Sequence, residues 1–211
     1  MMLARLLATA ALAALTAACA SSSPPPNMGG MRTVDYDPAM VGPVQGVGLE
    51  GHDIVNMSEM MVRDMMLNPL IGGNMASPRV IVDAEYFHNE SAQRINPSIF
   101  TDNLRVNLQK AANGRIKFVS RESFDMVAGE RDMKRSGVTD AGTLVPAKAQ
   151  LGADYRLRGR ITSTEQIHAG AGVIQRYNQV VFEMVDLENS EIVWTGMYNV
   201  ARAGADDVIY R

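Results

Sequence analysis

Residues 154–161 read Asp-Tyr-Arg-Leu-Arg-Gly-Arg-Ile, and an arginine occupies every second position from residue 156 to residue 160. Such alternation is typical of a β-strand, whose successive side chains point to opposite faces of a sheet. We expect the strand to continue to Ile167 and to turn its apolar face toward a core. That face carries Tyr155, Leu157, Gly159 and Ile161, and the opposite face carries Arg156, Arg158 and Arg160.

The three arginines form a ladder on one face of the predicted sheet, and two interpretations of the ladder are open. It could bind an acidic protein or an anionic polymer, because three guanidinium groups would lie side by side. Alternatively, a helix covers this face and its carboxylates pair with the arginines. We favour ion pairing over a binding site.

Two further β-rich segments follow this strand and predict an antiparallel meander. The glycine-rich turn at residues 169–172 leads into a strand over residues 174–187. Residues 188–190 then turn the chain into a last strand over residues 191–201. Short turns of this kind join neighbouring antiparallel strands.

The chain before residue 154 alternates between strand and helix patterns, which is typical of parallel pairing. A β-branched run over 79–87 precedes a helix that Asn96 caps and Pro97 begins. A short strand over 116–119 and a helix over 120–135 come next, then a loop over 136–144 and a short helix over 145–151. The apolar stripes of the two longer helices are Phe100, Leu104, Leu108 and Ala111 in the first, and Phe124, Val127 and Ala128 in the second.

A first helix is expected from Asp53 to Leu67, where apolar residues recur at helical spacing. Its stripe consists of Ile54, Met57, Met61, Met65 and Leu67. A face rich in methionine can be a promiscuous binding surface, but we favour a role as core filler. Together these patterns predict one α/β (α+β) domain over residues 53–211, with a single mixed β-sheet flanked by helices.

The amino terminus has the pattern of a bacterial lipoprotein signal over residues 1–18. Arg5 precedes an uncharged run of Leu, Ala and Thr, and Cys19, the single cysteine of the chain, follows the small residues at 17 and 18. The run is too short to span a bilayer, which takes about 20 apolar residues, but it suits a cleaved signal. We expect a lipid on Cys19; an ordinary secretory signal or a buried free thiol is the alternative. Since Ala20 replaces the Asp that retains lipoproteins in the inner membrane, we expect the outer membrane.

Residues 19–52 are expected to be a flexible linker behind the lipidated cysteine. They are rich in Ser, Pro and Gly, and their few apolar residues show no period. Ordering such a segment costs conformational entropy with little burial to offset it. The linker would let the domain work well away from the membrane that holds it.

Few residues in the sequence suggest catalysis, and none suggests a cofactor or a metal. His52, His88 and His168 are scattered in or beside predicted loops, so we expect them to be solvated. No serine lies in a Gly-x-Ser-x-Gly context, and the lipidated Cys19 leaves no thiol nucleophile. Gly170-Ala171-Gly172 is expected to be a hairpin turn and not a phosphate loop. The formal net charge of −3, with no run of Lys or Arg, argues against nucleic acid as a partner.

Several segments resemble one family of lipoproteins. Residues 151–161, Leu-Gly-Ala-Asp-Tyr-Arg-Leu-Arg-Gly-Arg-Ile, look like the "LGADY-x-L-x-G-x-I" strand of LpoB-type proteins. Residues 182–196 resemble the last hairpin of that family, in which "E-I-V-W" places Trp194 on the final strand. The pattern of 96–112 followed by 115–120 is also similar, and so is the order of lipid cysteine, linker and globular domain.

The resemblance implies a fold like the amino-terminal domain of TolB and a protein that is not itself an enzyme. It implies an outer-membrane lipoprotein, facing the periplasm as a monomer, that activates a bifunctional class A penicillin-binding protein. Cys19 is the single site residue that the resemblance carries over. The alternative function is a non-catalytic scaffold or assembly subunit of an envelope or secretion complex.

Overall fold

The computed structural model describes residues 34–72, 77–145, 149–168 and 170–205. The chain divides into two compact units, Met1–Tyr36 and Asp37–Arg211, and the second holds the folded domain. The predicted signal over 1–18 and Cys19 lie outside the described residues. No helix among the described residues is long and apolar enough to cross a membrane.

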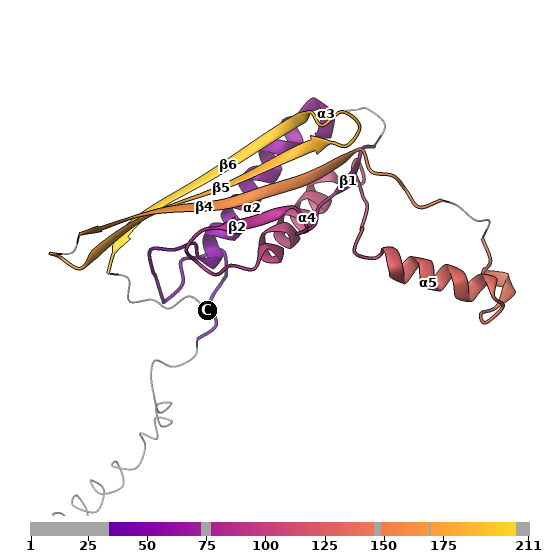
Figure 1. The fold of residues 1–211 in the computed structure, drawn as a ribbon, viewed down its shortest axis with the longest axis horizontal. Coiled ribbons are helices and arrows are strands. Elements are labelled where there is room, and N and C mark those ends of the chain that lie inside the picture. Colours follow the sequence, from indigo (N-terminus) through magenta and orange to yellow (C-terminus); the bar gives the residue numbers. More distant parts are fainter. Residues whose placement is uncertain (1–33, 73–76, 146–148, 169, 206–211) are drawn as a thin grey trace, which may run out of the picture. The chain divides into compact units, whose positions relative to one another are not determined.

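The centre of the domain is a single mixed sheet of six strands (Figure 1). Its order is β3-β1-β4-β5-β6, and β2 pairs with β4 farther along that strand. β1, β2 and β3 run parallel to their neighbours, whereas β4, β5 and β6 form the predicted antiparallel meander. The bounds are β1 Arg79–Ile81, β2 Phe87–Glu90, β3 Lys117–Phe118, β4 Tyr155–His168, β5 Val173–Asp186 and β6 Ile192–Gly204.

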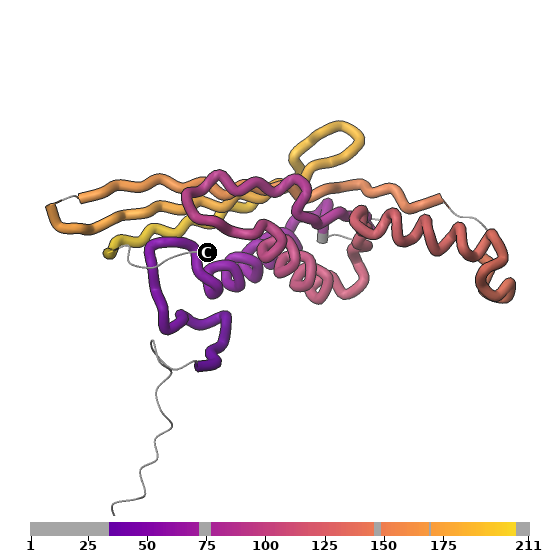
Figure 2. The backbone as a smooth tube through the Cα atoms, turned by 60° about the horizontal axis from the view of Figure 1, so that its bottom comes forward, coloured from indigo at the N-terminus to yellow at the C-terminus, as the bar shows by residue number. Residues whose placement is uncertain are grey.

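Two helices, α2 (Gly51–Leu67) and α4 (Pro97–Ala112), pack against each other on one face of the sheet (Figures 1 and 2). A short helix, α3 (Pro69–Gly72), follows α2. Asn96 caps α4 as predicted, since its side chain accepts from the Ser98 backbone N–H. The core between helices and sheet includes Met57, Met61, Met65, Phe100, Leu104, Leu108, Leu157, Ile161, Phe182 and Met184. The methionine face is therefore core filler, and a mixed sheet flanked by helices is confirmed.

Gly159 lies where aromatic rings of the core approach the backbone of β4. The Phe87 ring stacks on Phe182 with centroids 4.9 Å apart and on Phe100 at 5.5 Å. A Cβ on Gly159 would overlap the Phe87 ring and would come within 2.8 Å of Phe182 Cδ1. The glycine in the alternating strand therefore makes room for this aromatic cluster.

The structure corrects several predicted elements. The expected strand over 79–87 is divided into β1 and the later β2, and Leu67 is exposed instead of facing the core. Helix α5 (Phe124–Arg135) buries none of its residues, so the prediction that Phe124, Val127 and Ala128 face inward was wrong. Its apolar stripe is short, and none of its residues belongs to the core cluster or to the partly buried side chains packed against that cluster. No helix forms over the described part of 145–151; a 3-10 turn, η2 (Ala141–Thr143), precedes it.

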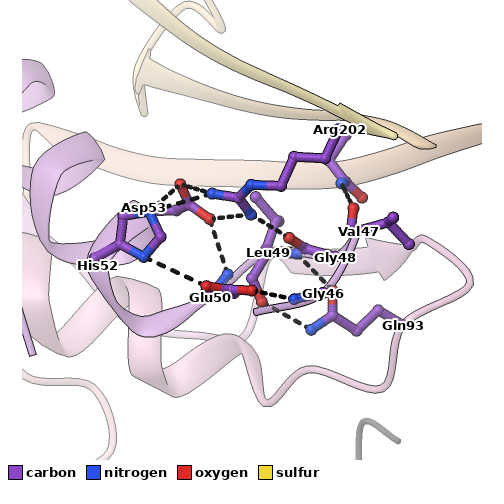
Figure 3. A network of polar contacts seen from close by, with 10 residues as sticks. Gly46, Val47, Gly48, Leu49, Glu50, His52, Asp53, Gln93 and Arg202 are labelled. Carbon is purple, nitrogen blue, oxygen red and sulfur yellow. Dashed lines mark hydrogen bonds and ion pairs between the residues drawn. The ribbon is translucent and has the colours of Figure 1, made fainter. Parts of the chain in front are cut away.

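Residues 46–50 pack on the domain directly before α2, ahead of the predicted boundary at residue 53 (Figure 3). Val47 and Leu49 are buried to 2% and 5% exposure. The Gln93 side chain accepts from Leu49 N–H and donates to Leu49 C=O, both at 2.8 Å. Arg202 donates to Gly48 C=O at 2.5 Å and to both carboxylate oxygens of Asp53 at 2.9 Å. We call residues 46–50 the entry segment.

Candidate interaction surface

The face of the sheet opposite α2 and α4, here called the outer face, carries the predicted arginine ladder. Alternation along β4 places Leu157 and Ile161 in the core and turns Arg156, Arg158 and Arg160 the other way. Arg158 and Arg160 are exposed, whereas the Arg156 side chain is 16% exposed. The division of β4 into an apolar and a cationic face is thus as the sequence predicted.

Arg156 is held by two carboxylates and an aromatic ring. It donates to both Asp83 oxygens, at 2.8 and 3.0 Å, and to Glu85, and its guanidinium lies 4.3 Å from the Tyr86 ring centroid. Burial alone would lower the pKa of Arg156, but the hydrogen bonds to Asp83 and Glu85 outweigh it and raise the pKa above its usual value. Arg156 is therefore a structural cation that ties the segment after β1 to β4.

The other two arginines differ from each other. Arg158 Nε donates to Glu183 Oε2 at 2.7 Å, across a direct β4–β5 pair. Arg160 has no ion-pair partner among the described residues. Ion pairing was therefore the right interpretation for Arg156 and Arg158, but the carboxylates come from the sheet and the β1–β2 connection instead of from a covering helix.

Arg160 borders a shallow depression of about 290 Å³ on the outer face. The lining residues are Tyr86, His88, Glu90, Arg158, Gly159, Arg160, Val181 and Glu183. The depression mixes both charges with aromatic and aliphatic surface. It can receive a side chain of another protein, and Arg160 can pair with a carboxylate there.

The described residues contain no group of three or more His, Asp or Glu side chains that could hold a metal ion. His88 lies in β2 and His168 at the end of β4, both exposed. The prediction of a solvated histidine was wrong for His52, whose side chain is 12% exposed and lies 3.2 Å from Arg202 Nη2. Residues 170–172 belong to the β4–β5 hairpin turn, as predicted, with Gly172 at φ +62°.

Sequence reasoning missed the groups that surround Arg156 and the entry segment. Asp83 and Glu85 reach Arg156 because β1 pairs with β4 in the register Ile81↔Arg156. Gln93 lies in the segment between β2 and α4, and Arg202 lies near the end of β6. No local pattern marks these contacts, since the partners are 44 to 154 residues apart in the chain.

The fold and this surface define an α+β domain with one helix-covered sheet face and one face that carries ion-paired arginines. A family model described as "Peptidoglycan-synthase activator LpoB" matches residues 53–200. The chain belongs to this family, which confirms the resemblance noted in the sequence.

Parts of this chain are also similar to solved structures. The LpoB C-terminal domain from Salmonella enterica is 17% identical with a TM-score of 0.42, and the alignment covers 70% of this chain and 98% of that one. The LpoB C-terminal domain from Escherichia coli is 20% identical with a TM-score of 0.40, over 71% and 99%. Lipoprotein GNA1162 from Neisseria meningitidis is 16% identical with a TM-score of 0.31, over 60% and 83%. A search of curated proteins returns no match.

Proposed function

We propose that this chain is an outer-membrane lipoprotein that binds and activates a class A penicillin-binding protein, a bifunctional peptidoglycan synthase. The observation that carries the proposal is the match of residues 53–200 to the family of peptidoglycan-synthase activators. Lipid on Cys19 would anchor the chain, and residues 20–45 would tether the domain on the periplasmic side as a monomer.

The depression on the outer face supports this proposal, because it can receive a side chain of another protein. An activator of this kind acts by binding the active conformation of its partner more tightly than the inactive one. A tenfold activation requires about 1.4 kcal/mol of such preference. A few well-packed contacts on a sheet surface are enough to supply it.

The test is polymerisation of lipid II by each class A synthase of the same organism, with and without residues 20–211. We expect one synthase to accelerate several-fold and to saturate as the domain is added. The control is an equal concentration of the domain unfolded by a charge in the core, Leu104→Asp, since Leu104 is fully buried. If no synthase responds, the activator function is refuted. Large assemblies of the folded domain in gel filtration would then favour an envelope scaffold.

A further inference from the structure

The two edge strands of the sheet order, β3 and β6, differ in how they are protected against pairing with a further strand. At one end, β3 has only two residues. At the other end, β6 has 13 residues and is the last strand in the sheet order. Proteins usually guard a long edge with lysine, proline or short strands, because its free N–H and C=O groups can accept a further strand.

The sequence of β6 has none of these guards. Ile192–Gly204 contains no proline and no lysine, and its one charged side chain, Arg202, is turned to Asp53 at 2.9 Å. Thr195, Met197 and Asn199 are exposed along it, with Met197 at 58%. Apart from its start, where Asn68 donates to Val193 C=O and the register with β5 shifts, the edge is long and its exposed side chains are uncharged, so that it can accept a strand.

An exposed stripe of helix α2 adjoins this edge. Trp194 Nε1 donates to Asp64 Oδ2 at 2.8 Å, and Asn68 Nδ2, at the end of α2, donates to Val193 C=O at 2.8 Å. Helical spacing places Met60, Arg63 and Leu67 on the same side of α2 as Asp64. Met60 and Leu67 are large apolar side chains that are 55% and 78% exposed.

The stripe also carries a free charge. Among the described residues, Arg63 has no ion-pair partner, and it lies between Met60 and Leu67 along the helix. The seven-residue rise from Met60 to Leu67 spans about 10 Å. Two or three inward-facing side chains of an extended strand, spaced about 6.7 Å apart, cover that distance. The exposed stripe of α2 beside β6 thus suits an extended segment that has apolar side chains at alternate positions and one carboxylate.

We propose that β6, with Met60, Arg63 and Leu67, is a docking site for an extended segment of the peptidoglycan synthase. The segment adds a strand to β6, packs apolar side chains on Met60 and Leu67, and places an acidic side chain at Arg63. This inference rests on the proposed function and names the contact that it uses. A second copy of this chain fits less well, because β6 itself, Ile192–Gly204, contains no Asp or Glu that could be placed at Arg63.

The experiment combines binding, activation and amide hydrogen exchange with the synthase that the domain stimulates. In the double variant Met60→Lys with Leu67→Lys, we expect at least a tenfold weaker affinity, and in Arg63→Glu a similar loss. The matched control is Ile99→Lys with Val106→Lys, two exposed positions on α4 that should bind within twofold of the native chain. Amides of residues 192–204 should exchange more slowly when the synthase is added.

The outcomes separate the two proposals. If the native domain activates the synthase while both α2 variants bind normally and exchange in β6 is unchanged, the docking site is refuted and the activator function stands. If no synthase is bound or activated, both fall. If β6 becomes protected by raising the concentration of the domain alone, a second copy occupies the edge and the docking proposal is overturned.

Discussion

At Gly159, the addition of a single methyl group should lower the stability of the domain. A methyl group at this position overlaps the Phe87 ring and lies 2.8 Å from Phe182 Cδ1, and both rings are nearly fully buried. Overpacking a close-packed core costs about 1–3 kcal/mol. We therefore expect Gly159→Ala to lower the free energy of unfolding by that amount, measured by urea titration.

The matched substitution for this experiment is Gly129→Ala in α5. A Cβ there meets no atom within 4 Å. Alanine is also favoured over glycine inside a helix. An unchanged or slightly raised stability is expected. Equal effects of the two substitutions would contradict the role assigned to the aromatic cluster.

Asp154, directly before β4, gives the stability of the domain a pH dependence. It accepts from Arg79 Nε at 3.1 Å, from Arg79 Nη2 and from the Arg79 backbone N–H at 2.8 Å. The side-chain hydrogen bond is the largest cause of a pKa for Asp154 below its usual value. Since the folded-state pKa is lowered, the stabilisation is present above the unfolded pKa of about 4 and is lost as pH falls through the folded value.

We therefore expect Asp154→Asn to reduce stability at pH 7 and to flatten the loss of stability below pH 4. Urea titrations of both proteins at pH 7 and at pH 3 measure this. Both side chains are more than a third exposed, so solvent screening keeps the effect small. Asp125→Asn on the exposed helix α5 serves as the control. Parallel pH profiles for Asp154→Asn and the native chain would refute the role of this pair.

Among the elements, the entry segment contributes to the stability of the folded domain although it has no regular secondary structure. Val47 and Leu49 are buried, and Glu50 and Asp53 form a capping box at the start of α2. Burying a valine or leucine side chain contributes about 1.5–3 kcal/mol. The fragment 53–211 should therefore be less stable than the fragment 44–211 by several kcal/mol, in urea titrations of both. Coincident transitions would show that residues 46–50 contribute nothing.

Local sequence patterns predicted some elements of the fold and missed others. The meander of β4, β5 and β6 was predictable, because alternation and glycine-rich or polar turns are local. The entry segment was not, since its two apolar residues lie among glycines and its partners Gln93 and Arg202 are distant in sequence. Helix α5 has the right period but a stripe too short to hold it against the core, which a pattern of residue types does not reveal.

For the whole molecule, parallel pairing was the hardest feature to anticipate in detail. Strand-helix-strand alternation predicted that parallel strands exist, but the register that brings Asp83 to Arg156 depends on contacts over 73 residues. The open outer face and the unguarded β6 edge follow from that topology. The sequence placed the arginines on one face of β4 and favoured ion pairing, but it did not reveal which carboxylates pair with Arg156 and Arg158.

The proposed lipid anchor on Cys19 has its own prediction. We expect Cys19→Ser to move the protein from the membrane fraction to the soluble fraction, or to leave an uncleaved precursor, because no thiol remains for lipid attachment. Fractionation followed by mass spectrometry of the amino-terminal peptide measures both outcomes. A Ser21→Ala substitution beside it serves as the control. An unchanged membrane fraction for Cys19→Ser would refute the lipid anchor.

The entry segment also determines how the domain would respond to a mechanical pull from its amino-terminal side. The side chains of Gln93, Arg202 and Asn178 hydrogen-bond to the backbone of residues 47–49. A force applied at residue 46 would load these hydrogen bonds before it loads α2 or the sheet. These side-chain contacts would yield first. Their release would let these five residues extend to at most about 17 Å while the core stays intact. In a chain held by a lipid at Cys19, the segment would thus lengthen under load before the domain itself unfolds.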